Sequence, residues 1–350
     1  MLIHRLTRCL PQATRYGGRN RTDQIAGLLR REGATIADID FFTRDFSDRA
    51  GNFRAGFAVW RTLRPPFTRD FASLWVLGRF VRLLRAAAPA GGVLAWENTD
   101  DTLVGIAARH LGWRVLALPH NLNSLYNASA RPLAARLRGL STEVAALATA
   151  DAVFTISPDE KNFLRLAGVP AELSPYHPAE DFAAELGRIR ERRSPRTDGP
   201  ILILGSAHNA HTLEGMSAQL RALSSAPGNF RRRVIVGGDA TEILAAEFPL
   251  PDVEFAGRIP AGRLDTLMSE IRALWIVQTA GTGVVTRLRD FTLAGIPVVA
   301  NSVAARSWER TPGVFILDRL ADLAATVETL PLVVPSQPSP PGPALLARIV

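Results

Sequence analysis

The stretch of sequence that decides the fold is GTGVVTRLRDFTLAGIPVVA, residues 281–300. A glycine-containing turn opens it, a helix carrying Arg287 and Asp290 follows, and an Ala-Gly-x-Pro break leads into an apolar strand. Backbone N–H groups at the start of such a helix attract anions, and an arginine one turn in can bind a diphosphate through two parallel hydrogen bonds. Asp290 lies three residues further on the same helix face, where its carboxylate can accept hydrogen bonds from a ribose diol. The alternative is an ordinary strand-turn-helix unit with surface charges.

Short apolar runs ending in or near glycine recur through the second half of the chain. We expect strands within residues 200–206, 233–239, 253–258, 273–277, 297–300 and 313–317. Strands at this spacing, alternating with helices, predict a doubly wound parallel sheet. Ligands of such sheets bind at the carboxyl ends of the strands. The ends expected here are Gly205-Ser206, Gly237-Gly238, Gly257-Arg258 and the Gly281 turn.

These segments resemble the nucleotide-sugar half of GT-B glycosyltransferases, especially retaining family 4. The likeness rests on the strand ends GS and GGD, on VEFAGRI and on the stretch 281–301. It places Arg287 at the family's phosphate-binding basic residue and Asp290 at the second glutamate of an E-x7-E motif, which holds the ribose. Thr282 stands where the first glutamate is expected. Ser206 and the residues after it stand where many members carry an Arg/Lys pair.

The resemblance implies a nucleotide-diphosphate sugar donor, held by strand ends of the second half and by a glycine pair of the first. The donor-binding residues it implies are Gly17, Gly18, Gly205, Ser206, Gly238, Arg258, Gly281, Thr282, Gly283, Arg287 and Asp290. It also implies that protein cations neutralise the diphosphate. We therefore expect no metal and no cofactor, with the nucleotide sugar as co-substrate.

The first half has its own series of expected strands, within residues 2–7, 92–96, 113–118 and 151–157, of which the last closes the lobe, and an early strand whose end carries Asp38 and Asp40. The pair Gly17-Gly18 is expected as a turn before a helix over about 20–31. Glu97 follows one strand and His120-Asn121 follow the next. The run PHNLNSL resembles the family's H-N/D-x-E variant. The resemblance implies that His120 contacts the transferred sugar, so that His120 and Arg287 are the catalytic residues, and that Glu97 and Asn121 bind the acceptor. Structural roles for the histidine and the glycines are the alternatives.

A chain of 350 residues predicts two domains. We expect α/β architecture of the GT-B type, two Rossmann-like parallel-sheet domains facing across a cleft. The expected boundaries are an acceptor-binding domain over 1–190, a polar linker over 191–199, a nucleotide-sugar domain over 200–332, and a proline-rich tail over 333–350 whose end is compatible with a short helix returning to the first domain.

Charge is the other clear signal, since the formal net charge is +8. Aromatic residues and arginines alternate between residues 41 and 85, a pattern that suits docking to an anionic membrane surface as well as a packed domain with a solvated exterior. The sequence has no run of 18 apolar residues and no secretory leader pattern, and it contains one cysteine, Cys9. Together these features favour a location in the cytoplasm, with docking to the inner face of the cytoplasmic membrane. No nucleic-acid-binding motif accompanies the basic charge, so we expect no nucleic-acid partner.

The function that these observations favour is transfer of a sugar from a nucleotide-diphosphate sugar to a hydroxyl of a glycan or lipid-linked acceptor, with retention, in the assembly of bacterial surface polysaccharide or glycolipid. A phosphorylase or epimerase on the same fold ranks lower. The alternative from another class is a catalytically degenerate GT-B module that binds nucleotide or glycan as a scaffold, motivated by Thr282.

Overall fold

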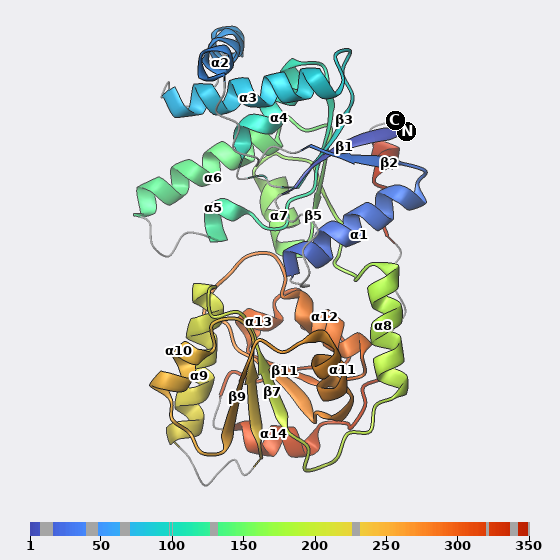
Figure 1. The fold of residues 1–350 in the computed structure, drawn as a ribbon, viewed down its shortest axis with the longest axis vertical. Coiled ribbons are helices and arrows are strands. Elements are labelled where there is room, and N and C mark those ends of the chain that lie inside the picture. Colours follow the sequence, from blue (N-terminus) through green and yellow to red (C-terminus); the bar gives the residue numbers. More distant parts are fainter. Residues whose placement is uncertain are drawn as a thin grey trace. The chain divides into compact units, whose positions relative to one another are not determined.

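The computed structural model describes residues 1–7, 17–39, 48–63, 71–97, 99, 101–126, 132–225, 232–319, 322–336 and 342–348. The chain divides into two compact units (Figure 1). Unit 1 consists of Met1–Tyr176 together with Pro340–Val350, and unit 2 of His177–Ser339. Each unit is built on its own six-stranded parallel sheet.

The sheet of unit 1 has the strand order β2-β1-β3-β4-β5-β6. Its strands are β1 (Leu2–Leu6), β2 (Thr35–Asp38), β3 (Val93–Trp96), β4 (Arg114–Ala117), β5 (Ala152–Thr155) and β6 (Ala171–Leu173). In β3, Leu94 and Trp96 belong to one apolar cluster and Ala95 belongs to another. Because successive side chains of a strand point to opposite faces, both faces of this sheet are buried, as a doubly wound fold requires.

Helices cover the two faces of the first sheet. They are α1 (Gly17–Arg31), α2 (Arg49–Leu63), α3 (Phe71–Ala87), α4 (Thr102–His110), α5 (Asn123–Tyr126), α6 (Leu133–Leu147) and α7 (Pro158–Leu166). The apolar stripe of α1, with Ile25 and Leu29, packs on one face, while α3, α4 and α6 contribute to the cluster on the other. Helix α2 packs on α3, where Gly56 and Gly78 permit backbone contact, since an added Cβ would lie 1.8 and 1.6 Å from a carbonyl oxygen of the partner helix.

The sheet of unit 2 has the order β12-β11-β10-β7-β8-β9. Its strands are β7 (Ile201–Leu204), β8 (Val234–Gly237), β9 (Val253–Gly257), β10 (Ala273–Ile276), β11 (Val298–Ala300) and β12 (Val314–Ile316). The accompanying helices are α8 (Glu180–Glu191), α9 (Ala210–Ser225), α10 (Glu242–Glu247), α11 (Ala261–Glu270), α12 (Thr286–Leu293), α13 (Ser302–Ala305) and α14 (Leu323–Thr329). Every strand expected in this half of the sequence is present, so the prediction of a doubly wound α/β fold is confirmed.

The division between the units falls between Tyr176 and His177, ahead of the expected linker at 191–199. The reason lies in α8, which packs against α11 and α12. Its Arg190 donates hydrogen bonds to the backbone oxygens of Thr292 and Leu293 at the end of α12, at 3.0 and 2.9 Å. Helix α8 is thereby tied to unit 2, although its sequence precedes the polar segment.

A segment following unit 2 completes the core of unit 1. Leu345 and Leu346 are buried in the apolar cluster that contains Ile25 of α1. Their backbone N–H groups both donate to the carboxylate of Glu32, each at 2.8 Å. A short 3-10 helix, η3 (Leu346–Arg348), ends the described residues.

Two details of the first half differ from expectation. Helix α1 begins at Gly17, so the glycine pair forms its first turn and does not precede it. The lobe does not close with β5, because β6 adds an edge strand beyond it. Strand β6 is only three residues long and carries Glu172, so it lacks the apolar run by which its neighbours are predicted.

Candidate functional site

The carboxyl ends of β7, β8 and β9 come together through glycine backbone. The Gly205 N–H donates to the oxygen of Gly237 at 3.0 Å, and the Gly238 N–H donates to the oxygen of Gly257 at 2.8 Å. Gly238 has φ +131°, and an added Cβ would lie 1.5 Å from the oxygen of Gly205. Only glycine fits here. These strand ends therefore lie together at one edge of the sheet, as the sequence predicted.

Helix α12 brings Arg287 to that same edge. The Arg287 guanidinium donates a hydrogen bond through Nη1 to the backbone oxygen of Leu204, the last residue of β7. An added Cβ on Gly205 would lie 3.0 Å from the same nitrogen. Val285, the N-cap of α12, makes no side-chain capping hydrogen bond. An arginine and the N-terminus of a helix thus adjoin the glycine-lined strand ends, an arrangement suited to binding an anion.

Asp290 occupies a more enclosed position on the same helix. Its side chain is buried, with 5% of the residue exposed, and so is that of the neighbouring Arg289. Burial lowers the pKa of Arg289, and the adjacent Asp290 carboxylate opposes that shift. The role of Asp290 as the ribose acceptor stays a prediction.

The glycine turn between β10 and α12 is held by two residues that the sequence pattern did not single out. Arg306, just after α13, donates to the backbone oxygens of Thr282 at 2.9 Å and Gly283 at 3.2 Å. Asn301 exchanges hydrogen bonds with the backbone of Gln278, at 3.1 and 2.8 Å. The one available signal was the position of Asn301 directly after β11, at a strand end of the parallel sheet.

Two further predicted donor residues, Ser206 and Arg258, lie near the ends of β7 and β9. Arg258 pairs with Asp239 at 3.5 Å, and both side chains are largely exposed. The backbone oxygen of Ser206 accepts a hydrogen bond from Asn209, and the Asn209 side chain accepts from the N–H of Thr212 at 3.1 Å. Unlike α12, helix α9 therefore carries a side-chain cap at its N-terminus.

Unit 1 contains a buried polar cluster at the carboxyl end of its sheet. Glu97 directly follows β3 and is 1% exposed. Its Oε2 accepts a hydrogen bond from Thr22 Oγ1 at 2.5 Å and lies 3.0 Å from His120 Nε2, while Arg5 Nε lies 4.0 Å from Oε1. Burial by itself would raise the pKa of Glu97, but hydrogen bonding and charge from His120, with Arg5 and Thr22, outweigh burial and hold the pKa below its usual value. The predicted residues Glu97 and His120 are thus a contacting pair.

Helix α1 contributes Arg21 to the same region. Arg21 is 1% exposed, and burial lowers its pKa to about 10, against the opposing effects of Glu97, Tyr176 and Glu160. Its Nη1 donates to Gln24 at 2.6 Å. The glycine pair Gly17-Gly18 lies one turn before these side chains. Arg21 was not predicted, because one more arginine in a basic helix forms no recognisable pattern.

The loop that carries His120 and Asn121 is fastened by two buried carboxylates. Glu160 accepts a hydrogen bond from the backbone N–H of Leu122 at 2.8 Å. Glu143 accepts from the N–H of Ser124 at 2.9 Å, and from Asn123 and Thr99 as well. Neither glutamate was predicted, since each sits within a helix and reaches the loop only in the folded chain. Asn121 is half-buried.

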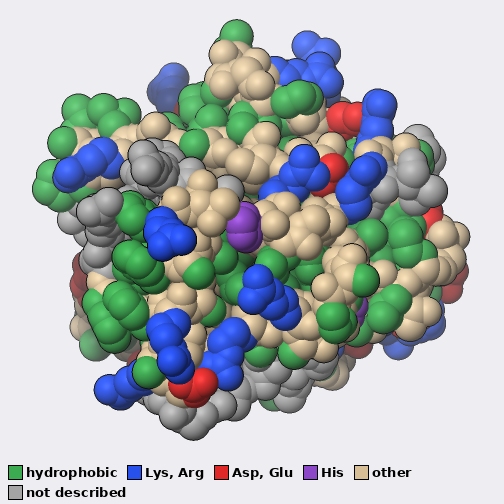
Figure 2. All heavy atoms as spheres, turned by 90° about the horizontal axis from the view of Figure 1, so that it is seen from above, with side chains coloured by type: hydrophobic (Ala, Val, Ile, Leu, Met, Phe, Trp, Pro, Cys, Tyr) green, Lys and Arg blue, Asp and Glu red, His purple; other side chains and the backbone are tan. Residues whose placement is uncertain are grey.

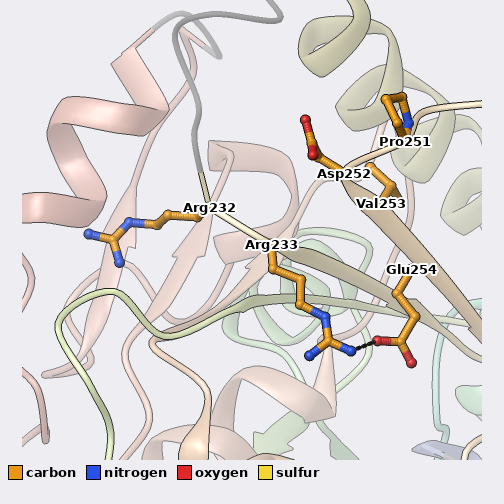
Figure 3. A pocket seen from close by; sticks show the side chains of 6 residues that line it. All are labelled: Arg232, Arg233, Pro251, Asp252, Val253 and Glu254. Atoms are coloured by element: carbon orange, nitrogen blue, oxygen red, sulfur yellow. Dashed lines mark hydrogen bonds and ion pairs between the residues drawn. The ribbon is translucent and has the colours of Figure 1, made fainter.

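A depression of about 430 Å³ lies at the opposite edge of the second sheet (Figure 3). It is lined by residues that precede or begin β8 and β9, namely Arg232, Arg233, Pro251, Asp252, Val253 and Glu254. An ion pair joins Arg233 to Glu254 across it. Ligands of parallel sheets bind at the carboxyl ends of strands, and this depression adjoins the amino ends, so it is not the candidate site.

Comparison with solved structures identifies the fold. The chain is similar to sucrose-phosphate synthase from Thermosynechococcus elongatus, with TM-score 0.62 and 18% identity over 93% of this chain and 88% of that one. It is similar to Anabaena HepE in complex with UDP-glucose (TM-score 0.60, 15% identity, 94% and 89% covered) and to α,α-trehalose 6-phosphate synthase from Burkholderia multivorans (TM-score 0.60, 14% identity, 95% and 89% covered). No family model matches the sequence, and no curated protein matches it. The chain has the GT-B fold, as its sequence predicted.

Proposed function

We propose that this protein is a glycosyltransferase that moves a sugar from a nucleotide-diphosphate sugar to a hydroxyl acceptor. The observation that carries the proposal is the edge of the second sheet, where Arg287 and the start of α12 adjoin the backbone of Gly205. Solved neighbours of the same fold include HepE with UDP-glucose bound and two enzymes named as synthases of sugar phosphates. UDP-sugars are accordingly the first donors to test.

The chemistry proposed for this edge is electrostatic. As the glycosidic bond breaks, negative charge accumulates on the leaving diphosphate. The Arg287 guanidinium and the N–H groups at the start of α12 stabilise that charge, and no metal is required in this proposal. Retention of configuration, with no dedicated general base, belongs to the same proposal.

The acceptor is proposed to bind unit 1 at the carboxyl end of its sheet. Glu97 and His120 form a polar pair there, 3.0 Å apart, with Thr22 against the same carboxylate oxygen. Such a pair can accept and donate hydrogen bonds to sugar hydroxyls. Glu97→Gln and Asn121→Ala are expected to raise the KM for the acceptor while leaving the Kd of the nucleotide unchanged.

A thermal-shift screen with UDP, GDP, ADP and their sugars tests the donor proposal. A ligand at a hundred times its Kd stabilises the folded protein by about 2.7 kcal/mol. The nucleotide-induced thermal shift is compared between wild type and Arg287→Ala. Arg310→Ala serves as the control, because Arg310 is exposed in the same unit. If no nucleotide shifts the wild-type midpoint, the proposal fails.

The second candidate function is a GT-B module that binds nucleotide without turnover, and Thr282 in the glycine turn favours it. Release of free sugar from the donor, measured without acceptor, separates the two. Slow hydrolysis that depends on Arg287 supports the transferase. Tight binding without any release supports the scaffold.

We further propose that unit 1 docks on an anionic membrane, where a lipid-linked acceptor for surface polysaccharide or glycolipid would be reached. Figure 2, which views the end that carries α2 and α3, shows basic and apolar side chains interspersed, with fewer acidic ones. Phe57 is 44% and Phe71 61% exposed, and Phe71 stacks on Phe53 at 4.9 Å. Other aromatics of the segment are core, such as Phe80 at 1%. None of the helices in the described ranges has the length and apolar character of a membrane span.

Flotation with vesicles containing anionic lipid tests this docking. Each arginine near such a surface contributes about 1 kcal/mol, and salt screens the attraction. We expect binding at low salt that weakens on replacing Arg54, Arg61 and Arg85 by glutamine, whereas the same change at Arg188, Arg310 and Arg319 of unit 2 has no effect. A wild type that ignores such vesicles at low salt contradicts the proposal. Arg64, Arg69 and the aromatics of residues 41–46 lie outside the described residues.

A further inference from the structure

Arg306, just after α13, makes several hydrogen bonds to the glycine turn and its surroundings. Besides the oxygens of Thr282 and Gly283, it donates through Nη1 to Gln278 Oε1 at 2.9 Å and to the oxygen of Val303 at 2.5 Å. Gln278 lies just beyond β10 and Val303 lies within α13. One guanidinium thus joins the ends of two adjacent strands, β10 and β11, to the turn that leads into α12.

These hydrogen bonds dictate how the turn presents its backbone. In a peptide unit the C=O and the N–H point in opposite directions. Arg306 draws the oxygens of Thr282 and Gly283 toward itself, so the N–H groups of the same two peptide units, which belong to Gly283 and Val284, are turned away from it. Gly283 has φ +65° and Gly281 has φ +146°, backbone conformations that glycine adopts without strain.

The backbone around Arg306 is held in an unusual conformation. Ser307, the next residue, has φ +69°, one of two non-glycine residues with positive φ among those the structure describes. Such a conformation persists only where the surroundings enforce it. An added Cβ on Gly281 would lie 2.8 Å from Arg306 Nη2, so the turn also leaves room for the guanidinium. The conformation of the glycine turn and the position of the Arg306 guanidinium therefore depend on each other.

We propose that Arg306 is a positioning residue for the donor diphosphate. By fixing the two carbonyl groups, it holds the course of the turn, and with it places the start of α12 and Arg287 to contact the phosphate oxygens. The inference rests on the proposed function, because it assumes that a diphosphate binds this edge. It adds a residue that no sequence pattern marks and assigns it a role in orientation.

The test compares Arg306→Lys and Arg306→Gln with wild type in calorimetric titrations. The probes are UDP, GDP and ADP, each paired with its nucleoside, which lacks the phosphates. For the diphosphate that binds wild type, we expect the Kd to rise about 10- to 100-fold, by analogy with residues that orient the ligands of a metal ion. The nucleoside should bind equally well to all three proteins. Lysine keeps the charge but cannot make the forked contacts, so it should not rescue binding.

Arg310→Gln is the matched control, because Arg310 is an exposed arginine four positions along the same segment. It should bind diphosphate and nucleoside as wild type does. Equal diphosphate Kd values for wild type and the Arg306 variants overturn the inference while leaving the proposed function intact. A parallel loss of nucleoside affinity and thermal stability also overturns it, because the role would then be general stability. If wild type binds no diphosphate, the proposed function fails, and this inference with it.

Discussion

The closest backbone approach at the candidate donor site makes Gly238→Ala the sharpest test of the structure. The added Cβ would lie 1.5 Å from the oxygen of Gly205 and 2.6 Å from its carbonyl carbon. Carbon and oxygen atoms normally come no closer than about 3.3 Å, so the ends of β7 and β8 must separate. The site itself is thereby deformed, because Arg287 lies against Gly205.

The expected cost has two parts. Alanine at φ +131° is strained by about 1–3 kcal/mol, and forcing an atom into a packed site adds about 1–3 kcal/mol. The free energy of unfolding of unit 2 should therefore fall by about 2–6 kcal/mol. Affinity for the nucleoside diphosphate should be lost as well.

Urea unfolding followed by tryptophan fluorescence measures the change, with buried Trp275 reporting on unit 2. Because the two units need not unfold together, far-UV circular dichroism should be recorded alongside. Gly187→Ala is the control: it lies in α8 of the same unit, an added Cβ meets no atom within 4 Å, and alanine should stabilise the helix by about 0.5–1 kcal/mol. A Gly238→Ala protein as stable as wild type would refute the described strand-end geometry.

Three further predictions concern single side chains. Arg287→Ala should lower turnover about 10²–10³-fold, since it removes a contact that strengthens as the diphosphate leaves, and unchanged turnover would exclude the proposed site. Asp290→Asn should weaken nucleoside binding about 10- to 100-fold in calorimetry, the effect of losing a hydrogen bond of ~1.5–3 kcal/mol to a charged group, and equal affinities would show that Asp290 does not contact the ribose. The pKa of Glu97 is lower in the folded protein than its usual value of 4.5, so the unfolded chain takes up the proton first as the pH falls. Above pH 4.5 Glu97 makes its full contribution to the free energy of unfolding, and this contribution is lost as the pH falls through the folded pKa. Glu97→Gln should therefore flatten the pH dependence of the free energy of unfolding, measured by urea titration at stepped pH. The same pH dependence in wild type and variant would contradict this prediction.

The sequence predicted most of the fold because the strands of unit 2 are short apolar runs bounded by glycine. The run at β7, ILIL, is buried along almost its whole length, and burial on both faces removes any ambiguity of pattern. Strand β6 was not predicted, because it lies at the sheet edge and includes Glu172. The two compact units divide ahead of the expected linker because the contacts of helix α8, those of Arg190 above all, are with unit 2, and these contacts cannot be read from its sequence.

The structure brings together predicted residues that follow neighbouring strands, although their roles stay predictions. Glu97 directly follows β3 and His120 lies three residues after β4, and the carboxyl ends of neighbouring parallel strands lie at the same edge of the sheet. Arg306, Glu143 and Glu160 were not predicted, because they act on backbone groups far along the chain and their residue types are common on helix surfaces. Such residues become visible only when the distances between segments are known.

Unit 1 is discontinuous in sequence, and this constrains the order in which the protein can be completed during synthesis. Leu345 and Leu346 close its apolar cluster, yet they leave the ribosome only after all of unit 2. Burying a leucine is worth about 1.5–3 kcal/mol, so the nascent first unit lacks a sizeable share of its final stability while unit 2 emerges. We expect unit 1 to reach its full resistance to proteolysis only after unit 2 has been synthesised, when Glu32 receives the N–H groups of the returning segment.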